Sequence, residues 1–133
     1  DEFTLVKTHT TIGYDSIRSA IEPSIFDRLM ESAMNSESLE FFREALNIAK
    51  YHHERWDGNG YPEGLKGPQI PLSARIMAIV DVFDALTNKK VYKDAWSIEK
   101  AFMYIKDNSG TQFDPDVVHA FTQEFDAIRK VFD

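Results

Sequence analysis

Apolar residues recur along this chain at intervals of three and four positions, which is the spacing of amphipathic helices. The clearest stripes predict helices near residues 39–49, 72–86, 98–105 and 117–132. Weaker spacing predicts two more, in residues 1–20 and 22–34. No stretch of useful length alternates between apolar and polar positions as a strand does. The pattern therefore predicts an all-α fold built as a helical bundle.

Two of the predicted helices carry recognisable ends. Asp114 followed by Pro115 is typical of a helix start, with the aspartate as N-cap and the proline in the first helical position. The helix before it is predicted to begin near Ser97 and to stop near Gly110, since glycine commonly follows a helix end. The last helix is predicted to continue unbroken to Phe132.

One stretch departs from the helical pattern. Residues 54–71 contain four glycines and three prolines, a density that regular helix does not tolerate. A loop of this length inside a compact domain is usually functional or disordered. Because Trp56, Tyr61, Leu65 and Ile70 supply apolar anchors, we expect an ordered loop.

Composition narrows the function classes. The 133 residues fit one domain, and 43% hydrophobic content is enough for a core. The net charge of −7 argues against general nucleic-acid binding, and the longest apolar run, 76–80, is too short for a membrane span. The lack of cysteine excludes disulfides and thiolate metal sites and is compatible with the cytoplasm, where we expect the protein.

The first candidate metal ligands are His52 and His53. Both extend inward-facing lines of the 39–49 helix at the point where it meets the glycine-rich loop. A neutral imidazole there can bind a metal through one nitrogen while a protein acceptor holds the other. On the residues alone, a pair of hydrogen-bonded core histidines is the more frequent explanation.

Two further residues extend this set. Asp81 lies on a helix that is apolar on every side, so we expect it to be buried and either bound to a cation or paired with Arg75 or a histidine. His9 lies on the apolar face of the first helix, where a histidine is more often simply packed. Together, nitrogen and oxygen ligands without sulfur suit iron, manganese or zinc.

Several long strings resemble the HD-GYP family, a branch of the HD superfamily of metal-dependent phosphohydrolases. The strongest is His-His-Glu-Arg-Trp-Asp-Gly-Asn-Gly-Tyr-Pro-Glu-Gly-Leu at 52–65, followed by matching segments at 70–76, 81–87, 92–96 and 113–118. The resemblance implies a bundle of the HD-domain type that holds two or three divalent metals, iron or manganese, and hydrolyses cyclic di-GMP in bacterial signalling.

The resemblance also implies roles for the ligand candidates. His52, His53 and Asp81 match metal ligands, and His9 looks like the ligand of an earlier helix. Within this chain it implies no catalytic residue apart from these ligands. Arg75 is expected to orient the Asp81 carboxylate without binding the metal itself.

Substrate contacts follow from the same resemblance. Lys93 matches a residue that contacts substrate phosphate, while Lys90 stands where the family often has arginine. A lysine there gives a point charge without the bidentate fork. Gly60, Tyr61 and Pro62 stand at the name-giving motif and are expected to shape the substrate pocket and to contact signalling proteins.

The His-Asp doublet of the family does not occur in this sequence. We therefore expect 1–133 to be a single partial domain that lacks the N-terminal helices carrying the doublet, is inactive by itself, and exposes apolar surface that a homodimer would cover. The alternative is a truncated or degenerate domain that binds a cyclic dinucleotide or a signalling protein without turnover.

Overall fold

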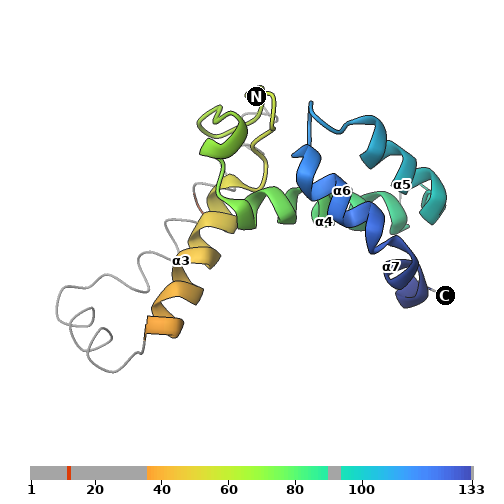
Figure 1. The fold of residues 1–133 in the computed structure, drawn as a ribbon, viewed down its shortest axis with the longest axis horizontal. Coiled ribbons are helices and arrows are strands. Elements are labelled where there is room, and N and C mark those ends of the chain that lie inside the picture. The colour runs from red at the N-terminus through yellow and green to blue at the C-terminus, as the bar shows by residue number, and fades with distance from the viewer. Residues whose placement is uncertain (1–11, 13–35, 90–93, 133) are drawn as a thin grey trace.

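The computed structural model describes residue 12, residues 36–89 and residues 94–132 (Figure 1). The helices predicted in residues 1–20 and 22–34 lie almost wholly outside this part of the chain. The described segments form five α-helices and one short 3-10 helix, with no strand among them, which confirms the all-α prediction. No helix among them is long and apolar enough to cross a bilayer.

The described helices follow one another in a simple order. They are α3 (Ser36–Tyr51), the 3-10 helix η1 (Gly67–Gln69), α4 (Leu72–Thr87), α5 (Ile98–Asp107), α6 (Pro115–Gln123) and α7 (Phe125–Phe132). Figure 1 shows α4 between α3 on one side and α5, α6 and α7 on the other. Since α4 contacts α3, α5 and α6, it is the element that connects the histidine-bearing helix to the rest. The predicted ordered loop, 54–71, joins α3 to α4.

The hydrophobic core lies where α4, α5 and α6 meet. Its buried members are Ile79, Phe83, Ala101, Ile105, Phe113 and Val118. The first two are four residues apart on α4 and the next two are four apart on α5, so each helix presents one stripe to the core. Burial of these stripes away from water holds the C-terminal helices on α4.

The predicted helix starts are confirmed. The Ser97 hydroxyl accepts the Lys100 N–H, and an Asp114 carboxylate oxygen accepts the Asp116 N–H. The predicted stop of α5 is too late, because the helix ends at Asp107. Gly110 lies in the turn that follows, with a φ of +85°, where its N–H donates to the Phe113 carbonyl.

The single helix predicted up to Phe132 is wrong, because the chain turns at Glu124 between α6 and α7. Rings on either side of this turn, Phe121 and Phe125, both contact Phe102 of α5. The Phe125 ring stacks on Phe102 with centroids 3.8 Å apart. The aromatic contacts across helices therefore accompany a break that the apolar spacing alone does not reveal.

The prediction that α4 is buried all round is also wrong. Ile79 and Phe83 are buried, but Leu72, Ile76 and Val80 are each about half exposed. The core occupies only one side of α4, and the neighbouring side borders a groove of about 240 Å³ that α6 completes. Part of the apolar surface of α4 is therefore exposed.

Candidate metal centre

The site begins where α3 ends. The backbone N–H of His52 still donates to the Ile48 carbonyl, 3.2 Å away, so the histidine continues the last helical turn. Its ring Nδ1 lies 2.7 Å from the same carbonyl oxygen. A carbonyl only accepts, so Nδ1 carries the proton in this bond. With the proton on Nδ1, Nε2 is the ring nitrogen through which His52 can bind a metal.

Asp81 on α4 lies across from the histidine pair. One ligand atom from each of His52, His53 and Asp81 can be chosen so that all lie within 4.8 Å of one another. That limit is slightly longer than two metal–ligand bonds of about 2.1 Å placed end to end. Small side-chain movements would therefore let all three contact one cation, and the donor set of two imidazoles and a carboxylate suits iron, manganese or zinc.

The environment of Asp81 differs from the prediction. The sequence predicted a buried carboxylate, whereas the structure exposes Asp81, because only the opposite side of α4 packs against the core. An exposed carboxylate keeps its hydration and needs no partner to be stable. Its place near the histidines therefore opens one side of the cluster to solvent.

The glycine-rich loop returns to this cluster through its Gly-Tyr-Pro segment. The ring of Tyr61 stacks on the ring of His53, with centroids 5.0 Å apart and planes 11° apart. The Tyr61 N–H donates to the His53 carbonyl at 3.2 Å, and the following bond to Pro62 is cis. The motif predicted from the sequence therefore lies directly against one of the ligand candidates.

The charge of Asp81 also affects the pKa of the Tyr61 phenol. Burial raises the pKa of the Tyr61 phenol above its usual value, and the negative charge of Asp81 raises this pKa further. Both effects disfavour the phenolate. Tyr61 therefore stays a neutral donor beside the cluster.

Gly60 allows the loop to approach so closely. A Cβ at this position would lie 2.6 Å from the His53 carbonyl oxygen and 2.7 Å from the Glu54 carbonyl carbon. Both are backbone atoms that side-chain rotation cannot move. Only glycine fits between Tyr61 and the end of α3.

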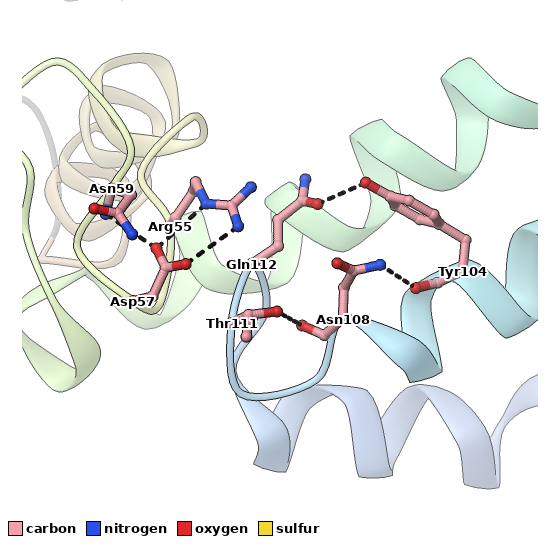
Figure 2. A network of polar contacts seen from close by, with 7 residues as sticks. All are labelled: Arg55, Asp57, Asn59, Tyr104, Asn108, Thr111 and Gln112. Atoms are coloured by element: carbon pink, nitrogen blue, oxygen red, sulfur yellow. Dashed lines mark hydrogen bonds and ion pairs between the residues drawn. The ribbon is translucent and has the colours of Figure 1, made fainter.

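Two acidic residues of the loop were not predicted as important. Glu54 is only 4% exposed, and its carboxylate accepts the N–H groups of Glu63, Gly64 and Leu65. Asp57 accepts two bonds from the Arg55 guanidinium and one from the Asn59 N–H, as Figure 2 shows in part. The sequence does offer a signal for each of them. Glu54 directly follows the histidine pair, and Asp57 directly precedes Gly58.

The loop is also tied to the turn before α6. The Trp56 N–H donates to the Gln112 carbonyl at 3.2 Å, and the Asp57 N–H donates to the Thr111 carbonyl at 2.8 Å. In Figure 2 the loop and this turn lie side by side, and the Gln112 side chain reaches on to Tyr104 of α5. The loop is thus held both by α3 and by the C-terminal helices.

Of the remaining predicted site residues, only Arg75 lies in the described part of the chain. The guanidinium of Arg75 contacts Asp114 and the Ile70 carbonyl, so the structure gives it these partners in place of Asp81. His9, Lys90 and Lys93 lie outside the described residues.

Comparison with known proteins identifies relatives. A sequence model of the HD domain matches residues 21–117. A cyclic di-GMP phosphodiesterase of Vibrio cholerae serotype O1 is 45% identical over 121 residues, which cover 91% of this chain and 22% of the relative. A 3'3'-cGAMP-specific phosphodiesterase 2 of the same organism is 42% identical over 93 residues, which cover 70% of this chain and 18% of the relative.

A solved structure supports the fold. The crystal structure of a cyclic GMP-AMP-specific phosphodiesterase of Vibrio cholerae matches with a TM-score of 0.56 and 24% identity, covering 96% of this chain and 38% of that one. The chain spans between 22% and 28% of the length of the first four curated relatives it matches. These likenesses confirm the predicted family and the HD-type helical fold.

Proposed function

Because this chain belongs to the HD domain family, we propose that it forms part of a metal-dependent phosphodiesterase that hydrolyses cyclic di-GMP. The observation that carries this proposal is the convergence of His52, His53 and Asp81 within 4.8 Å. It is supported by the Nδ1–H bond of His52, which makes Nε2 the ring nitrogen that can ligate a metal. The names of the relatives, cyclic di-GMP and cGAMP phosphodiesterases, favour a cyclic dinucleotide as substrate.

Each ligand residue has a defined part in this proposal. His52, His53 and Asp81 hold one divalent cation, and His9 adds a ligand to a site of two or three ions. Bound iron or manganese supplies the chemistry of water activation and of charge stabilisation on the phosphate. The exposed position of Asp81 leaves this side of the cluster open to substrate. Tyr61, which keeps its proton, is placed to donate a hydrogen bond at the same side.

The lysines complete the proposal. Lys93, assisted by Lys90, contacts the substrate phosphates, while Gly60, Tyr61 and Pro62 form one wall of the pocket and offer a surface to signalling proteins. Lys93→Ala should then weaken cyclic di-GMP binding most at low salt and leave metal content unchanged, because screening reduces only the electrostatic contribution. Lys90→Arg should strengthen binding by restoring a bidentate donor.

The deciding experiment compares Asp81→Ala with Asp84→Asn, a change at a second exposed carboxylate on α4 whose side chain contacts Asn88. Metal content is measured by elemental analysis after loading the full-length protein with manganese or iron. Hydrolysis of cyclic di-GMP and of 3'3'-cGAMP is followed by chromatography. We expect Asp81→Ala to lose metal and activity and Asp84→Asn to keep both. Unchanged metal in Asp81→Ala would overturn the assignment.

The same experiment separates the rival function. A full-length protein that binds cyclic di-GMP in equilibrium dialysis, but leaves it intact with metal loaded, would be a binding module. Preference for 3'3'-cGAMP over cyclic di-GMP would keep the hydrolase and change its substrate.

A further inference from the structure

The most unusual buried group outside the candidate ligands is the Glu54 carboxylate. It follows His53 directly and is 4% exposed. Removing a carboxylate from water is costly unless its charge is compensated. Among the described ion pairs none involves Glu54, so the compensation comes from elsewhere.

Three consecutive backbone N–H groups supply it. Glu63 and Gly64 donate to one oxygen of Glu54 at 2.7 and 3.1 Å, and Leu65 donates to the other at 2.9 Å. Gly64 has a φ of +70°, in the left-handed region that glycine adopts freely. Successive amides that converge in this way form a concave anion site, and their bonds to a charged acceptor are stronger than neutral ones. The Glu54 side chain, three residues after the end of α3, thus clamps the loop just beyond the Gly-Tyr-Pro segment.

The clamp determines where Tyr61 can lie. Before Tyr61, Gly60 packs against the backbone of residues 53–55, where no Cβ fits. After it, the amides of residues 63–65 are fixed on Glu54. The Tyr61 N–H bond to the His53 carbonyl lies between these two attachments. The stack of Tyr61 on His53 is therefore set by contacts on both sides of the tyrosine.

We propose that Glu54 is a positioning residue: its carboxylate clamps the loop so that the Tyr61 ring fixes the orientation of the His53 imidazole toward Asp81. The consequence for metal affinity rests on the proposed function, but the clamp itself does not. Partners that orient a ligating histidine typically contribute about 10–100-fold to metal affinity. The effect of Glu54 should lie in this range although its carboxylate, in the described part of the chain, is hydrogen-bonded to the loop backbone and not to a candidate ligand side chain.

The test uses Glu54→Gln, which keeps one acceptor oxygen and replaces the other by an NH₂ group. The matched control is Glu63→Gln, since Glu63 is a more exposed carboxylate in the same loop that pairs with Lys50. Tyr61→Leu provides the reference for a lost stack. All are compared by NMR in the metal-free state, through amide hydrogen exchange at residues 63–65 and the chemical shifts of the His53 ring protons.

We expect Glu54→Gln to speed exchange at Leu65 by at least about tenfold and to shift the His53 ring protons toward their values in Tyr61→Leu. Glu63→Gln should match the wild type in both. If Glu54→Gln does not fold, judged by circular dichroism, Glu54→Asp keeps both oxygens one methylene back and should give an intermediate shift. Wild-type values for the His53 ring in a folded Glu54 variant would overturn the proposal.

A manganese titration keeps this result separate from the proposed function. Glu54→Gln and Tyr61→Leu should weaken manganese binding by a similar factor, about tenfold or more. If the wild type binds no metal, the proposed function fails while the NMR comparison still decides the clamp. If the wild type binds and both variants bind equally well, the metal site stands and the positioning role of Glu54 is overturned.

Discussion

Arg75 of α4 and Asp114, thirty-nine residues later, form an ion pair that is largely withdrawn from solvent, with Nη1 and Oδ2 separated by 2.6 Å. The second oxygen of Asp114 caps α6, and the Nε of Arg75 binds the Ile70 carbonyl at the end of the loop. The guanidinium also lies 5.9 Å from the centre of the Trp56 ring. One pair of side chains thus connects the loop, α4 and α6.

Breaking this pair should be costly. Asp114→Ala leaves the Arg75 charge poorly compensated and removes the α6 cap, so we expect a loss of about 3 kcal/mol in the free energy of unfolding. Glu99→Ala is the control, because Glu99 and Arg129 pair on the exposed surface and should contribute less than about 1 kcal/mol. Urea denaturation measures both changes. Equal losses of stability in the two variants would show that the buried pair contributes no more than the exposed one.

A second prediction concerns Gly60. Gly60→Ala should displace the loop from the end of α3, because its Cβ would meet backbone atoms 2.6–2.7 Å away. We expect loss of the Tyr61–His53 stack and a stability loss above that of Gly67→Ala. Gly67 has open space around it and a φ of +58°, so its substitution costs only the left-handed strain of about 1 kcal/mol. Thermal unfolding compares the variants, and equal losses would contradict the close approach.

Much of this architecture was predictable from local pattern. The apolar stripes predicted α3, α4 and α5, the caps at Ser97 and Asp114 were correct, and the dense glycines and prolines placed the loop between α3 and α4. Helix-end position brought His52 and His53 to the loop. These features depend on residues that are close in sequence.

The features that the sequence did not predict depend on contacts between residues that are distant in sequence. The exposure of Asp81 follows from which side of α4 the core occupies, which the apolar residues on both sides of that helix do not reveal. Arg75 was expected beside Asp81, but its partner, Asp114, is the N-cap of α6. Glu54 is buried because amides nine to eleven residues later reach it, and no pattern of residue types records that contact.

A third prediction follows from the raised pKa of Tyr61. In the metal-free protein, Asp81→Asn should lower this pKa but leave it above the ordinary value near 10, because burial is the larger cause. A raised pKa means that the Tyr61 phenol keeps its proton to a higher pH in the folded state than in the unfolded state. The corresponding stability is therefore present below about pH 10 and is lost as the pH rises through the raised pKa. NMR titration of the Tyr61 ring carbon tests this. An unchanged Tyr61 pKa in Asp81→Asn would show that the Asp81 charge does not act on the phenol.

The last prediction concerns Asp57, whose bonds to Arg55 are shown in Figure 2. The hydrogen bonds from the Arg55 guanidinium hold the pKa of Asp57 below its usual value, against the opposing effect of desolvation. A lowered pKa contributes stability that is present above about pH 4 and is lost as the pH falls through the folded-state value. Because both side chains are partly exposed, at 36% and 23%, Arg55→Met should cost less than about 1 kcal/mol at pH 7.

The pH dependence identifies the source of this contribution. The stability difference between wild type and Arg55→Met should shrink as the pH falls from 5 toward 2, because protonation of Asp57 removes the charge-assisted bond from the wild type. Arg43→Met is the control, since Arg43 lies on the exposed side of α3 and meets Glu40 only at 4.0 Å. The loop should stay attached in Arg55→Met, because the backbone bonds from Trp56 and Asp57 to residues 111–112 do not involve this side chain. A difference that stays constant over this pH range would mean that Arg55 stabilises the loop by packing alone.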